Sequence, residues 1–198
     1  MPEVLTERSR AKADRRDALL TAATRLFAER GFASVSIEDL GASVGVSGPA
    51  VYRHFAGKQA VLAAILRDAS TGLLDGGTRV VDDAADTDSA LAALIRFHVD
   101  FALANADVIL VQDRDMSSLS ETDRHDIRRL QRRYVETWVG VLARLRPDQA
   151  ESELRIRAHA AFGLLNSTPH SARVHGRAPA DRVVRKILED MAWRSLTS

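Results

Sequence analysis

Four side chains that lie close together in the sequence could bind a nucleic acid: Tyr52, Arg53, His54 and Lys58. The guanidinium of Arg53 can pair with a guanine edge through two parallel hydrogen bonds, or bind a phosphate. Tyr52 and His54 can donate hydrogen bonds to phosphate oxygens, and Lys58 can add a positive charge and backbone amides at the start of a helix. These groups act on one ligand only if a compact element places them on one face.

The segment from Ser36 to Lys58 has the residue types that a helix-turn-helix requires at fixed offsets. It predicts short helices over residues 37–44 and 48–55, with Gly41 allowing them to approach closely and Gly45 free to take a positive φ. Serines stand at the two N-cap positions and apolar residues at the contact between the helices; these are Ser36 and Ser47, and Leu40, Val46 and Val51.

The second of these helices begins with Gly48, Pro49 and Ala50, which offer only backbone and small apolar groups to a DNA groove. We expect these residues to face outward and to make close packing contacts, for example with a thymine methyl group. Sequence choice then depends on Arg53 and on DNA shape. The predicted DNA-binding residues are Ser36, Ser47, Gly48, Pro49, Ala50, Tyr52, Arg53, His54 and Lys58.

The charge of the chain is nearly balanced, with 28 Lys and Arg residues against 27 Asp and Glu residues and a net charge of +1. This balance excludes a protein that coats nucleic acid through a general positive charge. Basic residues nevertheless cluster near the N-terminus, at Arg8, Arg10, Lys12, Arg15 and Arg16. The cluster fits either a solvated terminus or an arm that contacts phosphates or the minor groove.

The sequence contains no cysteine, which excludes disulfides, thiolate metal sites and cysteine nucleophiles. Its longest unbroken apolar run, residues 60–66, is far shorter than the roughly 20 residues that span a bilayer. We therefore expect a cytoplasmic protein with no transmembrane segment and no membrane partner.

Apolar residues recur at helical spacing along almost the whole chain, and no segment shows sustained strand-like alternation. The first helix is expected over residues 10–30, with Gly31 as its C-terminal stop. A fourth helix is expected from Lys58 to about Leu74, followed by a frayed stretch rich in glycine and aspartate that ends near Asp88.

Several later helices have recognisable N-terminal residues. Asp88 and Asp107 are each expected to open a helix, and Ser120 with Asp123 resembles a capping box at the start of a long one. Asp148 with Glu151 repeats that pattern. A last helix is expected after a loop from Pro169 to Pro179, and it carries Val184, Ile187, Leu188 and Met191.

The N-terminal motifs occur together as Phe27–Phe32, Ser36–Leu40, Gly45–Ser47, Val51–Phe55 and Lys58. They resemble the signature of the TetR family of transcriptional regulators, over about Leu19 to Ile65. The resemblance implies a homodimer that pairs through the last two long helices. It also implies an all-α fold, with a three-helix DNA-binding domain over residues 1–56 and a larger helical effector-binding and dimerisation domain over residues 57–198.

A ligand cavity is therefore expected in the second domain. Its predicted lining consists of apolar residues with a few polar ones: Phe97, His98, Phe101, Met116, Tyr134, Trp138, Phe162 and Asn166. Each of these also fits a plain core position, and His98 fits a core histidine with satisfied hydrogen bonds.

The class of effector is suggested by charge as well as by apolar lining. Arg128, Arg129, Arg132 and Arg133 fit either a solvated helix face or the rim of a site for an anionic group. A long apolar cavity with such a rim would suit an acyl thioester. We expect a repressor that binds a palindromic operator in double-stranded DNA and is released by a small, largely apolar effector, with no cofactor.

Two other classes stay open: an all-helical metal-dependent enzyme, and an architectural DNA-binding protein without a sensor. The paired Glu-x-x-His motifs of helical metal oxidases are absent, as are a phosphate loop and a nucleophile elbow, so no catalytic residue and no metal site are predicted. His125 with Asp126, or His170 with His175, could hold a metal as an effector. An architectural protein would leave well over half of the chain without a role.

Overall fold

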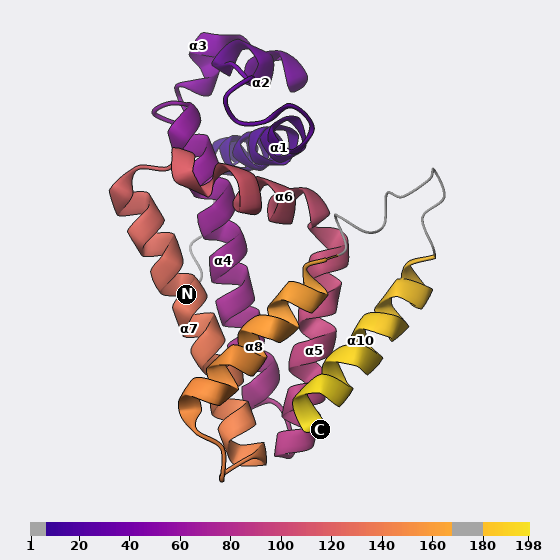
Figure 1. Ribbon diagram of the computed structural model, residues 1–198. Coiled ribbons are helices and arrows are strands. Elements are labelled where there is room, and N and C mark those ends of the chain that lie inside the picture. Colours follow the sequence, from indigo (N-terminus) through magenta and orange to yellow (C-terminus); the bar gives the residue numbers. More distant parts are fainter. Residues whose placement is uncertain (1–6, 168–179) are drawn as a thin grey trace. The chain divides into compact units, whose positions relative to one another are not determined.

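The computed structural model describes residues 7–167 and 180–198 (Figure 1), which form helices joined by turns, with no strand among them. The all-α prediction is confirmed, and the predicted loop from Pro169 to Pro179 lies outside the described residues. No helix in the described part is long and apolar enough to cross a membrane. In chain order the elements are α1 (Glu7–Arg30), α2 (Ile37–Ser43), α3 (Gly48–Val51), α4 (Lys58–Asp82), α5 (Thr87–Ala104), α6 (Ala106–Asp115), the 3₁₀ helix η1 (Met116–Ser118), α7 (Glu121–Leu145), α8 (Glu151–Leu165) and α10 (Asp181–Thr197).

The described helices form two compact units. The first unit contains the described residues up to Leu66 together with Leu110–Arg124, and the second contains the described residues of Arg67–Ile109 and His125–Ser198. The division by contacts therefore falls inside α4, whereas the boundary predicted from the sequence lies before this helix. Part of α6 and the first turn of α7 belong to the first unit.

The first unit is built on one buried face of α1. Leu19, Ala23, Leu26 and Phe27 are all buried, as their helical spacing predicts. The helix stops where Gly31 takes a φ of 85°, a left-handed conformation that a side chain disfavours. The Phe27 ring meets the Phe32 ring edge to face, with 5.4 Å between centroids, so the turn after α1 folds back onto the helix.

The C-terminal end of α1 is capped by an arginine far away in the sequence. Arg114, on α6, donates hydrogen bonds to the carbonyl oxygens of Phe27 and Ala28. Asp115 orients the guanidinium through two hydrogen bonds, of 3.0 Å to Nε and 2.9 Å to Nη2. The Phe27 carbonyl also accepts from the Gly31 amide at 2.8 Å, and the Ala28 carbonyl is among those that a helix end leaves without intrahelical partners, so α6 completes the end of α1.

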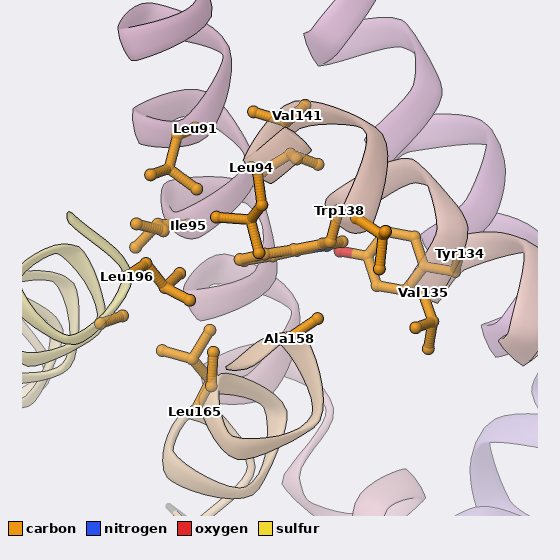
Figure 2. Close-up of a cluster of buried hydrophobic side chains, with 14 of the residues drawn as sticks. Leu91, Leu94, Ile95, Tyr134, Val135, Trp138, Val141, Ala158, Leu165 and Leu196 are labelled. Carbon is orange, nitrogen blue, oxygen red and sulfur yellow. The ribbon is translucent and has the colours of Figure 1, made fainter. Parts of the chain in front are cut away.

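The core of the second unit surrounds Trp138 of α7, which is fully buried (Figure 2). Helices α5 and α8 both pack against α10, and α5 also contacts α8. The core side chains labelled around Trp138 in Figure 2 are Leu91, Leu94 and Ile95 from α5, Tyr134, Val135 and Val141 from α7, Ala158 and Leu165 from α8, and Leu196 from α10.

Helix α4 continues eight residues beyond its predicted end at Leu74, through Gly76 and Gly77 to Asp82. The prediction was wrong because glycine was read as a helix breaker, whereas here the missing side chains make room for aromatic rings. A Cβ on Gly76 would lie 2.3 Å from Cζ of Phe97, and one on Gly77 would lie 2.4 Å from Cε2 of Tyr134. Packing against these rings offsets the low helix propensity of glycine.

Three predicted N-termini have different outcomes. Ser120 forms the predicted cap of α7, since its Oγ accepts from the Asp123 amide at 3.1 Å. Helix α5 instead begins two residues before the predicted Asp88, at an Asp86 capping box in which the Asp86 carboxylate accepts from the Ser89 amide at 2.7 Å. The predicted cap of α8 at Asp148 is wrong, because Ala150 is the N-cap and has no side chain that could accept a hydrogen bond.

Gly77 and Gly72 of α4 differ in their surroundings and therefore provide a test of this packing. We expect Gly77→Ala to destabilise the protein by about 1–3 kcal/mol, because the buried Tyr134 ring cannot move away from the new Cβ. Gly72→Ala, with nothing within 4 Å of its Cβ, should stabilise the protein by about 0.5–1 kcal/mol. Urea unfolding followed by circular dichroism measures both, and equal stabilisation by the two changes would contradict the packing described.

Candidate nucleic-acid interface and aromatic cluster

The first candidate site is the pair of short helices α2 and α3. Ser36 is the N-cap of α2: its Oγ accepts from the Asp39 amide at 3.0 Å, and the Asp39 carboxylate accepts from the Ser36 amide at 2.8 Å. These hydrogen bonds hold the pKa of Asp39 below its ordinary value. Ser47 occupies the N-cap position of α3, but its side chain makes no capping hydrogen bond.

Two glycines set the geometry between α2 and α3, as the sequence predicts. A Cβ on Gly41 would lie 2.6 Å from the carbonyl oxygen of Val46, so only glycine allows this approach of backbone to helix. Gly45 takes a φ of 70° in the turn. Leu40 and Val51 are buried between the helices, while Val46, predicted in the same small core, is only half-buried.

The surface of this motif presents most of the predicted residues, with one exception. Pro49, Tyr52 and Arg53 are exposed, and Ala50 and His54 are half-buried. Gly48 was predicted to face outward but is buried, because its Cα lies against the Glu38 side chain, whose Oε1 would be 3.2 Å from a Cβ. Side-chain contacts with a groove are therefore expected from the residues after Gly48.

A groove of about 180 Å³ lies between α1 and this motif, lined by Arg15, Val46, Ala50, Arg53 and His54. Two guanidinium groups and an imidazole therefore converge on one hollow, which is suited to an anion such as a phosphate. The sequence placed Arg15 in a basic cluster without separating it from the other four members. Neighbouring Arg16 instead stacks on the Phe55 ring, 5.4 Å from its centroid.

Lys58 has a structural contact that sequence reasoning missed. Its ammonium donates to the carbonyl oxygens of Phe32, at 2.8 Å, and Ala33, at 3.3 Å, and lies 4.5 Å from the centre of the Phe32 ring. This side chain therefore ties the start of α4 to the turn after α1. That Lys58 also contacts DNA stays a prediction.

The second candidate site is an aromatic cluster in the second unit, centred on His98 of α5. The His98 ring stacks on Phe162 and on Tyr134, with centroids 5.0 Å and 5.8 Å away, and meets Trp138 edge to face at 6.0 Å. Phe101 lies at the side of the same ring, 6.1 Å away. These five residues come from α5, α7 and α8.

His98 joins this cluster through two hydrogen bonds. Its Nε2 lies 3.1 Å from Oδ1 of Asn166, and its Nδ1 lies 3.1 Å from the hydroxyl of Tyr134. Because an amide oxygen only accepts, Nε2 carries the proton and Nδ1 accepts from Tyr134. Burial lowers the pKa of His98 to about 4, although the Asn166 hydrogen bond raises it. These contacts fit the interpretation of His98 as a core histidine with satisfied hydrogen bonds, and its role in binding an effector stays a prediction.

The structure brings together seven of the eight residues predicted to line the ligand cavity. Phe97 packs against the same core and lies over Gly76 of α4. Met116 is the exception: it belongs to η1 in the first unit, so it is not part of the cluster. The four arginines predicted as a solvated face or a rim, Arg128, Arg129, Arg132 and Arg133, are all exposed.

The structure describes only one of the two residue pairs that the sequence offered as metal ligands. His125 is exposed, and Asp126 forms an ion pair with Arg67 at 3.5 Å. No group of three potential metal ligands occurs within residues 7–167 and 180–198. His170 and His175 lie outside the described residues.

Comparison with known proteins matches both parts of the chain to one family. Residues 19–65 match the family model "Bacterial regulatory proteins, tetR family", and residues 84–196 match "Tetracyclin repressor-like, C-terminal domain". A curated relative, the HTH-type transcriptional repressor KstR2 of Rhodococcus jostii, is 26% identical over 183 residues, which cover 89% of each chain.

Solved structures share the fold at lower identity. A TetR-family transcriptional regulator from Bordetella parapertussis superposes with a TM-score of 0.80 at 21% identity, over 90% of this chain and 94% of that one. AibR, solved in complex with isovaleryl coenzyme A and operator DNA, superposes with a TM-score of 0.76 at 18% identity, over 89% and 97%.

The buried neutral His98 predicts how stability depends on pH. Its pKa is about 4 in the folded protein and 6.5 as the ordinary value, so the unfolded chain binds more protons between these values. The contribution of His98 to the free energy of unfolding should therefore be fully present above about pH 6.5. It should fall by roughly 3 kcal/mol as the pH is lowered towards 4.

Urea unfolding across this pH range measures the effect. His98→Gln should flatten the dependence between pH 6.5 and 4, because the titrating imidazole is gone. His159→Gln, which removes an exposed histidine of α8, should leave the slope unchanged. A His98→Gln variant with the full wild-type slope would show that another group is responsible.

Proposed function

Because the chain belongs to the TetR family of bacterial regulatory proteins, we propose that it is a ligand-responsive transcriptional repressor that binds a palindromic operator as a homodimer. In this proposal residues 1–56 form the DNA-binding domain, and residues 57–198 bind the effector and dimerise. The protein acts where its operator DNA is, in the cytoplasm. The relative KstR2 carries the name of a transcriptional repressor, which supports repression as the mode of action.

One observation carries the proposal: Tyr52 and Arg53, in the turn that follows α3 and ends the predicted second helix early, are exposed beside the groove that Arg15 and His54 also line. A recognition helix reads base edges from its exposed side while flanking groups hold phosphates. The short side chains of Pro49 and Ala50 allow the backbone close to the bases. Arg53 is the residue with the reach and the paired donors to read a guanine.

The second unit supports the role of sensor. Its aromatic cluster holds both apolar surface and polar groups, the composition of a small-molecule site. We propose that a small, largely apolar effector binds at Phe97, His98, Phe101, Tyr134, Trp138, Phe162 and Asn166. An acyl thioester is one candidate class, and the complex of the similar protein AibR with isovaleryl coenzyme A supports it.

Effector binding is proposed to release the operator through α4. This helix begins at Lys58 in the first unit and continues into the second, where Gly77 contacts Tyr134 of the cluster. A tilt of α4 would change the spacing of the two recognition helices of a dimer, whose half-sites lie one helical turn of DNA, about 34 Å, or more apart. Such couplings commonly amount to about 1–3 kcal/mol.

The proposed dimer uses α8 and α10, which pack together and expose apolar side chains. Val183, Ile187 and Met191 follow one another at intervals of four along α10, with exposed fractions of 43%, 52% and 50%. Ile156 of α8 is 69% exposed. An apolar stripe of this kind on an otherwise charged surface is typical of a protein–protein contact.

Arg53 should carry sequence recognition. An operator is first selected from random double-stranded DNA, and affinity is then measured by fluorescence anisotropy at fixed salt. We expect Arg53→Ala to weaken operator binding by about 10- to 100-fold. It should also reduce the slope of log affinity against log salt concentration by about one. Arg129→Ala removes the same charge from the exposed face of α7 and should leave affinity within about twofold. An equal loss of operator affinity in the two variants would contradict base recognition by Arg53, because it would show that only the positive charge matters.

Ile187 should be needed for association. Ile187→Glu places a charge in the middle of the apolar stripe, and we expect it to convert the dimer to a monomer by analytical ultracentrifugation. Thr122→Glu adds the same charge at the exposed start of α7 and should leave the dimer intact. Circular dichroism confirms that both variants stay helical. An unchanged dimer in Ile187→Glu would place the interface elsewhere.

A further inference from the structure

Glu38, in the first turn of α2, is an acidic residue within the motif proposed to bind DNA. Its neighbour Asp39 is engaged in the capping box, where the carboxylate accepts from the amide and the hydroxyl of Ser36 at 2.8 Å and 2.7 Å. Glu38 is exposed, and its carboxylate forms no hydrogen bond and no ion pair with any group that the structure describes. Because a negative charge is repelled by DNA phosphates, its presence here requires an explanation.

The Glu38 side chain lies at the start of α3, over the bare Cα of Gly48. Helices α2 and α3 pack against each other (Figure 1), and a Cβ on Gly48 would lie 3.2 Å from Oε1 of Glu38 and 3.6 Å from its Cδ and Cγ. Gly48 is the first residue of α3 and directly precedes the exposed Pro49. The Glu38 carboxylate therefore occupies the space that a side chain of residue 48 would take.

The N-terminal side chains of a recognition helix are those that reach base edges. In α3 these are Gly48, Pro49 and Ala50, none of which has a side chain that can form a hydrogen bond. Glu38 supplies an acceptor at this place from the neighbouring helix. Sequence recognition by the start of α3 therefore depends on a residue of α2.

Only two groups in the major groove can donate a hydrogen bond to a carboxylate: the N4 amino group of cytosine and the N6 amino group of adenine. Adenine also presents the acceptor N7 beside N6, and this lone pair repels a carboxylate. Cytosine presents its amino group alone. The chemistry of the Glu38 side chain therefore favours cytosine.

The same charge disfavours the other bases. Guanine and thymine present acceptor atoms, so a carboxylate that faces them loses its hydration and gains no donor. Phosphates repel it in DNA of any sequence. A carboxylate at this place therefore increases the ratio of operator binding to random binding, and it does so mainly by weakening the binding of wrong sequences.

We propose, on the basis of the DNA-binding function argued above, that Glu38 selects cytosine at one position of each operator half-site by accepting a hydrogen bond from its N4 amino group. Gly48 positions the carboxylate, because its missing side chain leaves room for Glu38 against α3. Arg53 is a donor and Glu38 an acceptor, so the two residues select different bases.

Selection from random double-stranded DNA by the full chain tests the base. We expect the wild type to select a cytosine at one symmetric position, where Glu38→Ala shows no preference. Glu38→Gln keeps the shape of the side chain and adds a donor, so it should select adenine there through N6 and N7. Identical selected sequences for the three proteins would overturn the proposal. So would a loss of preference at a position where the wild type selects a base other than cytosine.

Fluorescence anisotropy at fixed salt separates base recognition from charge. The wild type should bind the selected operator about 5- to 50-fold more tightly than one in which thymine replaces this cytosine in one half-site. In Glu38→Ala this preference should fall below about twofold, while affinity for random DNA rises about two- to fivefold. Asp83→Ala removes a negative charge from the exposed turn after α4 and should change neither. A full preference for cytosine in Glu38→Ala would exclude the contact.

A purely structural role of Glu38 predicts a different result. A negative charge in the first turn of α2 also stabilises the helix, so its removal can lower the stability of the DNA-binding motif. Partial unfolding would weaken binding to operator and random DNA by the same factor, whereas base selection changes their ratio. Urea unfolding gives the folded fraction of each variant. Equal loss of both affinities would overturn the proposal.

The selection experiment also separates this inference from the proposed function. An operator that the wild type selects, and that both Glu38 variants select unchanged, refutes this inference alone. If the wild type enriches no sequence from random DNA, the proposed repressor function and this inference both fail.

Discussion

The second unit depends on the contact between the Tyr134 ring and the bare backbone of α4 at Gly77. Only glycine leaves room there, since a Cβ would lie 2.4 Å from the ring. With the ring in this position, the Tyr134 hydroxyl reaches Nδ1 of His98, and His98 in turn reaches Asn166. One close approach therefore positions a hydrogen-bonded chain that links α7, α5 and the C-cap of α8.

The first unit rests on the same kind of constraint in a smaller space. Gly41 lets the turn before α3 lie against α2, and the positive φ of Gly45 turns the chain between them. The unit is then completed by residues distant in the sequence, because Arg114 of α6 caps α1 and Lys58 of α4 holds the turn after it. Two basic side chains are used here for structure, while Arg15, Arg53 and His54 line the groove.

The net charge of the chain is only +1, but its charged groups are unevenly distributed between the two units. The groups suited to phosphate lie around one groove of the first unit, and the centre of the second unit is neutral despite two titratable side chains. Burial produces that neutrality, since it disfavours the charged form of both histidine and tyrosine. The centre of the second unit therefore presents apolar and hydrogen-bonding groups, whereas the groove presents positive charge.

Local patterns in the sequence were enough to predict the helical class, the helix-turn-helix, its glycine turn and the caps at Ser36 and Ser120, because each depends on a few neighbouring residues. Some local predictions still missed by two residues, at the caps of α5 and α8, and others failed where more distant residues decide the outcome. Helix α4 passes through Gly76 and Gly77 because rings from α5 and α7 fill the space that their missing side chains leave, and Gly48 is buried because Glu38 lies over it.

Seven of the predicted cavity residues do meet, yet their sequence spacing could not show that His98 is neutral or that both of its ring nitrogens have hydrogen-bond partners. Both properties arise from burial among side chains of three helices. The sequence by itself determined the elements and their chemistry; the tertiary structure decided which groups are in contact and which stay uncharged, because only packing removes water from them.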